Sequence, residues 1–321
     1  MPISAMYAPV QEDLAKLEDR LRLVSKVGSS WLFKLLEYSL EGGGKRVRPA
    51  LTLLSGKFYD YNLDCLLLMA TAVELFHTAT LVHDDAIDKS LVRRGRPTIN
   101  SVWDEDKAVL LGNYLFAKAG ELVTDTKNLR VVKLFTQTLM TISSGELSQS
   151  FSAFNLEQSL QNYLERISGK TASLFSMATE SGAILSQAPG KSVQVLKEYG
   201  YNLGIAFQIV DDILDFIGTE EEMGKPIGSD LAQGTLTLPA MILLERYPED
   251  NPIKRVFQGE DKQKNIELAI ELIRDSSIVS ECYKVASEYC SKACHSLNLL
   301  PDIASRQALI ALADYIVDRK R

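Results

Sequence analysis

The sequence predicts an all-α protein, a single large helical bundle with a core wide enough to hold a cavity. Apolar residues recur at three- and four-residue steps, as at Leu14, Leu17 and Leu21 near the N-terminus and at Ile266 and Ala269 toward the C-terminus. Alternating Val/Ile/Thr segments bounded by Asn-Gly or Asp-Gly turns are missing. Long helices packed side by side are the ordinary way to bury such a pattern.

Glycine and proline separate the helical patterns, at 42–44, 95–97, 224–226, Pro248 and Pro301. The helices predicted between these breaks span residues 10–25, 31–40, 47–58, 63–88, 105–124, 129–153, 156–185, 191–217, 232–246, 262–274, 277–297 and 303–319. No linker, low-complexity segment or repeat divides the chain. We therefore expect one domain over residues 1–321.

Composition narrows the class of protein. The 321 residues are 46% hydrophobic and 24% charged, which is typical of a globular protein with a large core. A net charge of −7 and the lack of a sizeable Lys/Arg stripe argue against a nucleic-acid partner. The four cysteines are too few and too uneven for a disulfide scaffold.

The sequence gives no sign of a membrane segment or a leader. The N-terminus lacks the basic start and apolar run of a signal peptide. The longest apolar stretch, 65–73, ends at Glu74, and we expect it to be too short to span a bilayer. A cytoplasmic protein is the expectation.

Three aspartates end the apolar run CLLLMATAVELFHTATLV. Asp84 and Asp88 are one helical turn apart and share a face, with Asp85 beside them. Like charges at this spacing repel each other. Taken alone, this cluster fits a solvated acidic helix end as well as a binding site.

A second cluster repeats the DDxxD pattern in IAFQIVDDILDFIG, at Asp211, Asp212 and Asp215. These aspartates lie inside an apolar run, where carboxylates are costly unless cations neutralise them. Two facing sets of oxygen ligands suit Mg²⁺, a hard cation that also bridges to substrate phosphates. The pair of clusters therefore favours a magnesium site for a phosphate-bearing substrate.

Basic side chains that could neutralise such a substrate occur in five other segments. They are Lys45, Arg46 and Arg48 in GGGKRVRPA, His77, Arg93 and Arg94 after the first acidic cluster, Lys170 in ISGKTASLF, and Lys225 in GKPIGSD. Each alone fits a surface charge. Together with six aspartates they are interpreted as diphosphate-binding residues.

These motifs resemble those of all-trans isoprenyl (polyprenyl) diphosphate synthases of the medium- or long-chain type. The matching elements are GGGKRVRP, FHTATLVHDDAIDKSLVRRG, GELSQ, GKTASLF, FQIVDDILD and GKPIGSDLAQGTLTLP, with a weaker match at YIVDRKR. They run in order from about Gly42 to Pro239. The resemblance implies an all-helical fold around a deep central cavity, usually in a homodimer.

The resemblance also implies a metal site. Asp84, Asp85 and Asp88 would bind two magnesium ions on an allylic diphosphate. Asp211, together with Asp215, would hold a third. Mn²⁺ would serve as a substitute for Mg²⁺ in these positions.

Substrate contacts follow from the same resemblance. Farnesyl or geranylgeranyl diphosphate is the allylic substrate expected, with Arg93, Lys170 and Lys225 on its diphosphate and with Thr171 and Gln208 lining the space where the carbocation forms. The other substrate, isopentenyl diphosphate, would be held by Lys45, Arg48, His77 and Arg94. The implied reaction is ionisation, condensation and elimination, with the proton leaving to the released diphosphate.

Two parts of the match carry no assigned step. Thr235 stands where many relatives have a second lysine, which removes one expected diphosphate contact. Glu146 and Gln149 in GELSQ match the family, but no chemical step is assigned to them.

The residues before the first cluster bear on product length. In this family, residues four and five positions before the first aspartate form a floor, and here they are the small Thr80 and Ala79. Phe76 lies one turn deeper and could act as a lower floor. The expected product is therefore a hexaprenyl to decaprenyl diphosphate, with geranylgeranyl diphosphate as the alternative if Phe76 closes the cavity.

Two other classes of protein remain open. A terpene cyclase shares the first acidic motif, but its second motif normally mixes Asn, Ser and Glu, and it lacks the site of Lys45, Arg48 and Arg94. A non-catalytic subunit of a heteromeric synthase typically loses an acidic cluster, whereas both are intact here.

Two weaker features stand outside this scheme. Cys290 and Cys294, with His295 beside them, favour a small buried cysteine pair over a zinc site. The basic end at 319–321 fits either a closing tail or a solvated one.

Overall fold

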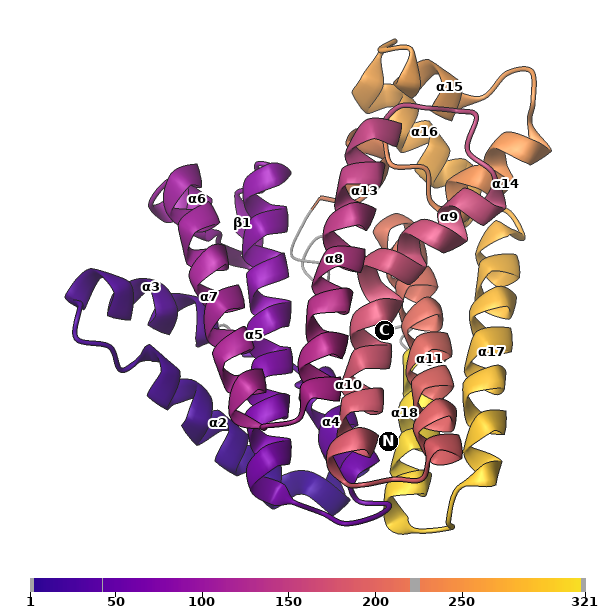
Figure 1. The fold of residues 1–321 in the computed structure, drawn as a ribbon. Coiled ribbons are helices and arrows are strands. Elements are labelled where there is room, and N and C mark those ends of the chain that lie inside the picture. Colours follow the sequence, from indigo (N-terminus) through magenta and orange to yellow (C-terminus); the bar gives the residue numbers. More distant parts are fainter. Residues whose placement is uncertain (1–2, 42, 220–225, 319–321) are drawn as a thin grey trace.

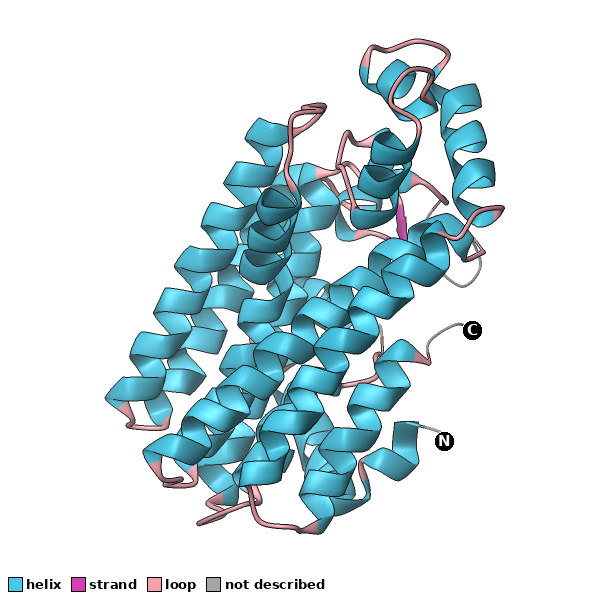
Figure 2. Cartoon of the chain, turned by 90° about the vertical axis from the view of Figure 1, so that its right-hand side faces the viewer, coloured by secondary structure: helices cyan, strands magenta, loops and turns pink. Residues whose placement is uncertain are grey.

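Long helices running roughly side by side make up the body of the molecule (Figure 1). The computed structural model describes residues 3–41, 43–219 and 226–318. The longest of its helices are α5 (Leu63–Ile87), α7 (Glu105–Asp125), α8 (Leu129–Ser152), α11 (Gly190–Ile217) and α17 (Ile278–Ser296). Shorter helices gather at one end of the bundle, and the two termini lie on the same side of it (Figure 2). The predicted all-α class is confirmed.

The remaining elements connect and cover these helices. Before α5 lie α1 (Ile3–Met6), a 3₁₀ turn (Ala8–Val10), α2 (Gln11–Ser25), α3 (Ser30–Leu40) and α4 (Val47–Gly56). After α5 come β1 (Val92–Arg93), β2 (Arg96–Pro97), α6 (Ile99–Val102), α9 (Leu160–Ile167), a π-helical segment (Ser168–Ala172), α10 (Ser173–Leu185), α13 (Ser229–Ala232), α14 (Leu238–Arg246), α15 (Pro252–Phe257), α16 (Lys262–Arg274), a 3₁₀ turn (Leu297–Leu299) and α18 (Ala304–Val317).

Side-chain caps fix where several helices begin. The side chain of Asn62 accepts a hydrogen bond from the backbone of Cys65 at the start of α5, and Asp104 does the same at the start of α7. Ser159 and Asn162 form a reciprocal capping box at α9. Caps of this kind satisfy backbone N–H groups that have no partner inside the helix, so short polar residues mark these starts in the sequence.

The core forms where α5 packs against α4 and α7, and where α11 packs against α10 and α17. Two glycines permit close approaches there. A Cβ at Gly112 would lie 2.2 Å from the ring of His83, and one at Gly204 would lie 2.6 Å from Cα of Ala172. Since real Cβ contacts are essentially never that short, a larger residue at Gly112 would displace the His83 ring, and one at Gly204 would push the two backbones apart. Gly204 thereby sets the distance between α11 and the π-helical segment.

Two predicted helices are interrupted. The helix expected over 156–185 is α9, then the π-helical segment, then α10. The one expected over 232–246 is preceded by the short α13 and begins only at Leu238, with Pro239 in its first turn. Periodicity did not reveal these breaks, because one is a single π-helical segment inside a continuing helical run and the other is a gap of five residues between α13 and α14.

A hairpin of two short strands, each of two residues, follows α5, where no strand was expected. Val92 pairs with Pro97 and Arg93 with Arg96 in an antiparallel register. The turn residues Arg94 and Gly95 both have positive φ, 52° and 71°. That geometry matches the tight two-residue turns that join antiparallel strands. The hairpin sends the neighbouring side chains of Arg93 and Arg94 in different directions.

Helix α5 is long and apolar enough, by length and composition, to cross a membrane. The expectation from the 65–73 stretch alone was therefore wrong on length, because the helix continues past Glu74. However, 67% of its most apolar window is buried inside the protein. Its burial marks α5 as a core helix of the bundle.

Candidate active site

The first acidic cluster lies at the C-terminal end of α5. Asp85 is 6% exposed, and its carboxylate accepts a hydrogen bond of 2.8 Å from Nε of Arg93. Burial raises the pKa of Asp85, and the charges of Asp84 and Asp88 raise it further, against the lowering effect of Arg93. A cation bound at this cluster would relieve that repulsion.

The structure places Arg93 beside the first acidic cluster. Arg93 was expected to contact the allylic diphosphate, and that expectation stays a prediction. In the structure it is an ion-pair partner of the first acidic cluster. Since a guanidinium cannot be deprotonated, Arg93 would have to leave Asp85, or share it, when a metal ion binds there.

Lys170 connects the π-helical segment to α5 and α8. Its Nζ lies 2.7 Å from Oε1 of Glu146 and 3.8 Å from Oδ2 of Asp84. Burial opposes the charged form of Lys170, yet its pKa is raised because Asp84, Glu146 and Asp88 surround it. Burial also raises the pKa of Glu146, assisted by Asp84 and Asp88 and opposed by Lys170. Sequence reasoning left Glu146 without a role, and its place in the GELSQ match was the only signal.

The three aspartates of the second cluster face different surroundings. Asp211 is half-buried, whereas Asp212 and Asp215 are 3% and 1% exposed. Asp215 accepts hydrogen bonds from Oγ of Ser229 at 2.9 Å and from the backbone N–H of Asp230 at 3.2 Å. Asp215 therefore ties α11 to α13, and Asp211 is the most exposed carboxylate of the cluster.

A chain of hydrogen bonds brings Thr171 and Gln208 together. The hydroxyl of Thr171 donates to Oε1 of Gln208 at 2.6 Å. Nε2 of Gln208 donates to Oδ1 of Asp212 at 2.8 Å, and the Tyr163 hydroxyl donates to Oδ2 of Asp212, also at 2.8 Å. Thr171 and Gln208 were predicted to act together, whereas Tyr163 carries no motif that would have identified it.

Arg48 and His77 form the centre of the predicted isopentenyl diphosphate site. Nη1 of Arg48 lies 3.2 Å from Nε2 of His77, and its guanidinium stacks 4.5 Å from the ring centroid of Phe175. Burial lowers the pKa of His77 well below its ordinary value, and the charges of Arg48 and Arg94 lower it further. The imidazole is therefore neutral and accepts the hydrogen bond from Arg48.

Lys45 and Arg94 lie beside this pair. Nη1 of Arg94 donates to the backbone carbonyl of Gly43 at 3.1 Å, so the hairpin contacts the glycine-rich turn. Nζ of Lys45 lies 5.3 Å from the ring centroid of Tyr315 on α18, and its carbonyl accepts a 2.7 Å hydrogen bond from Tyr7. Elements from both ends of the chain therefore border this basic set.

Arg46 does not join the substrate-facing cations. Its Nε lies 2.6 Å from Oε1 of Glu18, and its Nη1 lies 2.6 Å from Oε1 of Glu74. The interpretation of Arg46 as a diphosphate ligand is therefore wrong for this structure. Lys225, Gly42 and the basic end at 319–321 lie outside the described residues.

The predicted floor residues lie on the buried side of α5. Phe76 is fully buried and makes edge-to-face contacts with Phe116 and Phe135, at centroid distances of 5.1 and 5.2 Å. Ala79 is also fully buried. Thr80 is half-buried and donates a hydrogen bond to the carbonyl of His77. These three phenylalanines form an aromatic cluster that joins α5 to α7 and α8.

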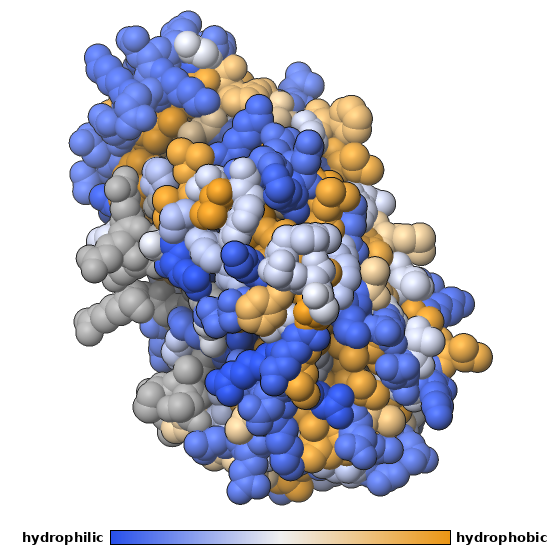
Figure 3. All heavy atoms as spheres, turned by 90° about the vertical axis from the view of Figure 1, so that its left-hand side faces the viewer, coloured by the Kyte–Doolittle hydropathy of each residue, from blue (hydrophilic) through white to orange (hydrophobic). Residues whose placement is uncertain are grey.

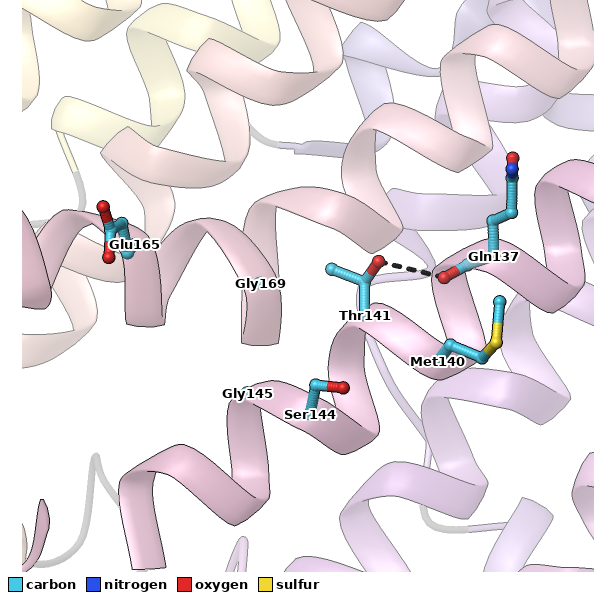
Figure 4. Close-up of a pocket in the computed structure, with 7 residues that line it drawn as sticks. All are labelled: Gln137, Met140, Thr141, Ser144, Gly145, Glu165 and Gly169. Carbon is cyan, nitrogen blue, oxygen red and sulfur yellow. Dashed lines mark hydrogen bonds between the residues drawn. The ribbon is translucent and has the colours of Figure 1, made fainter. Parts of the chain in front are cut away.

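Other predicted features lie away from these clusters. A surface groove of about 690 Å³ lies where α8 passes Gly169 and α9, and its lining contains none of the predicted site residues (Figure 4). Cys290 is buried, and its thiol donates to the carbonyl of Ala313. Thr235 is half-buried, and its backbone N–H donates to the carbonyl of Asp230.

The oxygen donors fit a divalent cation that is completed by substrate and water. Across the parts of the chain that the structure describes, no three carboxylates, imidazoles or thiols are gathered into a ready-made metal site. The aspartates form two clusters, one at the C-terminal end of α5 and one near the C-terminal end of α11. Mg²⁺ commonly keeps several waters and binds through one or two carboxylates plus phosphate oxygens, which suits such open clusters.

The arrangement defines a class of protein first. An all-helical bundle carries two acidic clusters and two separate basic sets, one around Lys170 and Arg93 and one around Arg48 and His77. Such a site can hold two phosphate-bearing substrates at once and neutralise the charge of a leaving diphosphate.

Comparison with known proteins identifies the family. The chain matches the family described as polyprenyl synthetase over residues 29–273. It is 38% identical over 320 residues to the heptaprenyl diphosphate synthase component 2 of Bacillus subtilis, covering 100% of this chain and 92% of that protein. The chain belongs to the polyprenyl synthetase family and is a polyprenyl diphosphate synthase.

Solved structures agree with this assignment. A decaprenyl diphosphate synthase from Rhodobacter capsulatus has a TM-score of 0.92 and 39% identity over 100% of both chains. A polyprenyl synthase from Caulobacter crescentus, complexed with calcium and isoprenyl diphosphate, has a TM-score of 0.94 and 32% identity, covering 99% of this chain and 98% of that one. The family acts on isoprenoid diphosphates and uses a divalent metal ion to ionise a diphosphate.

Proposed function

We propose that this protein adds isopentenyl diphosphate units to farnesyl or geranylgeranyl diphosphate and makes an all-trans hexaprenyl to decaprenyl diphosphate. This proposal rests on the second basic set, which lies around Arg48 and His77 and is independent of the first. A terpene cyclase ionises one diphosphate and has no use for a second site. Both acidic clusters are intact, which supports a catalytic chain over a silent subunit.

The metal ligands on this proposal are Asp84, Asp85 and Asp88 for two magnesium ions and Asp211, with Asp215, for a third. Mn²⁺ would serve as a substitute for Mg²⁺ at these sites. When bound, these ions supply positive charge to the departing diphosphate. The hydrogen bonds that Asp215 already accepts make Asp211 the stronger candidate of the second cluster.

The chain's own residues supply the rest of the chemistry. Arg93, Lys170 and Lys225 bind the allylic diphosphate and stabilise the charge that develops on it as its C–O bond breaks. Thr171 and Gln208 present oxygen atoms to the allylic cation. Isopentenyl diphosphate is held at reacting distance by the second basic set, which consists of Lys45, Arg48, His77 and Arg94.

The elongation step ends with loss of a proton to the released diphosphate. No side chain of the described site is assigned as the base. The apolar residues around the two acidic clusters exclude water, which would otherwise trap the allylic cation as an alcohol.

Product length is assigned from α5. Ala79 and Thr80 are small, and Phe76 lies below them in the aromatic cluster. Two of the similar proteins are named heptaprenyl and decaprenyl diphosphate synthases, which supports a medium or long product. Geranylgeranyl diphosphate is the alternative product if Phe76 closes the cavity.

A homodimer in the cytoplasm is the proposed state, with no nucleic acid and no membrane-spanning segment. Large apolar side chains are exposed on α7 and α8, among them Leu110, Met140, Leu147 and Phe151. The face over α2, α3, α6 and α7 also carries hydrophobic side chains among polar ones (Figure 3). The name component 2 of the Bacillus relative makes a heteromeric partner the competing arrangement.

One assay tests the enzyme and its class. The purified protein is incubated with magnesium, isopentenyl diphosphate and farnesyl diphosphate, and its products are separated by chromatography. Chains of six to ten isoprene units support the proposal. Absence of diphosphate release contradicts it, and release without elongation indicates a cyclase or hydrolase. Activity that appears only with a second protein indicates a heteromeric enzyme.

A further inference from the structure

Asp212 has no assigned part in the reaction, although it lies next to a proposed metal ligand. It is 3% exposed, and each of its carboxylate oxygens accepts a 2.8 Å hydrogen bond, one from Gln208 and one from Tyr163. Gln208 and Asp212 are one turn apart on α11 and share a face, whereas Asp211 lies about 100° around the helix from Asp212. Asp212 therefore points to the interior of the bundle.

The side chain of Tyr163 is also fixed in position by its neighbours. Its side chain is fully buried on α9, and the guanidinium of Arg166 lies 5.4 Å from its ring centroid. Arg166 is itself fixed, because it donates a 2.6 Å hydrogen bond to the carbonyl of Leu236. The Tyr163–Asp212 contact thus connects α9 to α11 across the π-helical segment that carries Lys170 and Thr171.

The hydrogen bonds along this chain run in one direction. In its ionised form the carboxylate of Asp212 only accepts hydrogen bonds, so it receives the hydroxyl hydrogen of Tyr163 and an amide hydrogen of Gln208. That fixes the amide orientation of Gln208 and leaves its oxygen facing Thr171, which donates to it at 2.6 Å. The hydroxyl hydrogen of Thr171 is then used in the hydrogen bond to Gln208. The lone pairs of the Thr171 hydroxyl oxygen are left to face the reacting atoms.

We propose that Asp212 and Tyr163 are positioning residues that orient Gln208, and through it Thr171, toward the allylic cation. The inference rests on the proposed function, in which Thr171 and Gln208 line the reacting space. Fixed oxygen dipoles stabilise developing positive charge without reorganising during the reaction. An amide that is free to turn over would present its N–H groups instead and would destabilise the cation.

The first test is Asp212→Asn, which keeps the shape but lets the side chain donate as well as accept. We expect kcat for elongation to fall about 30-fold, because a misoriented dipole costs roughly that much in a preorganised site. KM for both substrates and the half-saturating Mg²⁺ concentration stay within about threefold, since neither diphosphate nor metal touches Asp212. A tenfold rise in half-saturating Mg²⁺ would show that Asp212 is a metal ligand and would overturn the proposal.

The second test is Tyr163→Phe, which removes one hydroxyl and no other heavy atom. If Asp212→Asn does not fold, Tyr163→Phe tests the proposal in its place. We expect kcat to fall about fivefold, and the share of allylic diphosphate released as prenyl alcohol to rise, because a less stabilised cation is captured more often by water. An unchanged kcat together with an unchanged alcohol share contradicts the proposal.

A double-mutant cycle tests whether Asp212 acts through Thr171. Once Thr171→Val has removed the hydroxyl, adding Asp212→Asn should cost much less than it does in the wild type. Fully additive losses would mean that Asp212 acts by another route, and the proposal would fail.

Asp13→Asn is the matched control. Asp13 is also buried, 7% exposed, and accepts a 2.7 Å hydrogen bond from a tyrosine hydroxyl, that of Tyr61, but it lies on α2 outside the site. It should lower thermal stability and leave kcat and the alcohol share unchanged. Equal losses of kcat in Asp13→Asn and Asp212→Asn would indicate general destabilisation and overturn the proposal. Failure of the wild type to elongate would instead reject the proposed function, which separates the two claims.

Discussion

Arg46 and Glu74 form a buried ion pair, in which Nη1 of the guanidinium lies 2.6 Å from Oε1 of the carboxylate. Their side chains are 12% and 8% exposed. The backbone of Arg46 is left-handed, with a φ of 47°, which is uncommon for a residue other than glycine. This conformation turns Arg46 toward α2 and α5, while Lys45 and Arg48 on either side border the basic set. The pair therefore anchors the segment of the chain that carries Lys45 to α5.

Arg46→Met should weaken isopentenyl diphosphate binding without touching that substrate. Removing one partner strands Glu74 as a buried charge, so the free energy of unfolding should fall by about 3 kcal/mol. KM for isopentenyl diphosphate should rise about tenfold and KM for the allylic substrate should change little, because the segment that carries Lys45 moves and α5 does not. Arg22→Met, which removes the exposed pair with Asp19 on α2, is the control and should change neither quantity. Equal rises of both KM values would refute the anchoring role.

Arg93 is paired with Asp85 in the structure, so on the proposed function it would compete with a metal ion for this carboxylate when no substrate is bound. We therefore expect Arg93→Gln to tighten Mn²⁺ binding to the free enzyme a few-fold, measured by titration, and to raise KM for the allylic diphosphate at least tenfold. Arg94→Gln should instead raise KM for isopentenyl diphosphate and leave Mn²⁺ binding unchanged. Weaker Mn²⁺ binding in Arg93→Gln would show that Arg93 supports the metal site and does not compete with it.

His77 should make stability depend on pH. Its pKa is lowered by burial first and by Arg48 and Arg94 next, so between that lowered pKa and the ordinary value of 6.5 the unfolded chain binds more protons than the folded one. Stability is therefore complete above pH 6.5 and falls as the pH drops below it. His77→Gln keeps a hydrogen-bond acceptor for Arg48 but does not titrate. The variant should therefore lose less of its free energy of unfolding below pH 6.5, as measured by urea titrations at several pH values. His295→Gln, exposed on α17, is the control, and an identical acid-side slope in wild type and His77→Gln would contradict the prediction.

Helices and aspartates were predictable because their signals are local. Apolar periodicity shows which face of a helix is buried, and DDxxD shows that carboxylates share a face. The direction of Arg46 was not predictable, because residue spacing does not reveal a left-handed backbone at one position. Glu18 lies 28 residues from Arg46, and no local pattern connects them.

The site's supporting contacts were hidden for the same reason. Tyr163 and Asp212 are 49 residues apart and meet only because the π-helical segment and Gly204 bring α9 and α11 together. The DDxxD pattern contains Asp211 and Asp212 side by side, and the resemblance gave a metal-binding role to Asp211 only, without showing that Asp212 is the buried one. Their difference in exposure arises from packing against α9, which a single sequence does not encode in any short pattern.

Phe76 should limit product length from below. It fills the space between Phe116 on α7 and Phe135 on α8, so Phe76→Ala opens a cavity under Ala79 and should lengthen the product by at least one isoprene unit. The free energy of unfolding should fall by about 3 to 5 kcal/mol, as is usual when a buried phenylalanine is truncated. Conversely, Ala79→Tyr should shorten the product, because the added ring has no space on the fully buried side of α5 and must enter the path of the growing chain.

The control variant is Leu309→Ala on α18. It opens a comparable core cavity away from α5 and should leave the product distribution unchanged. Chromatography of the products from all three variants decides the matter, and identical chain lengths in Phe76→Ala, Ala79→Tyr and wild type would reject this face of α5 as the floor.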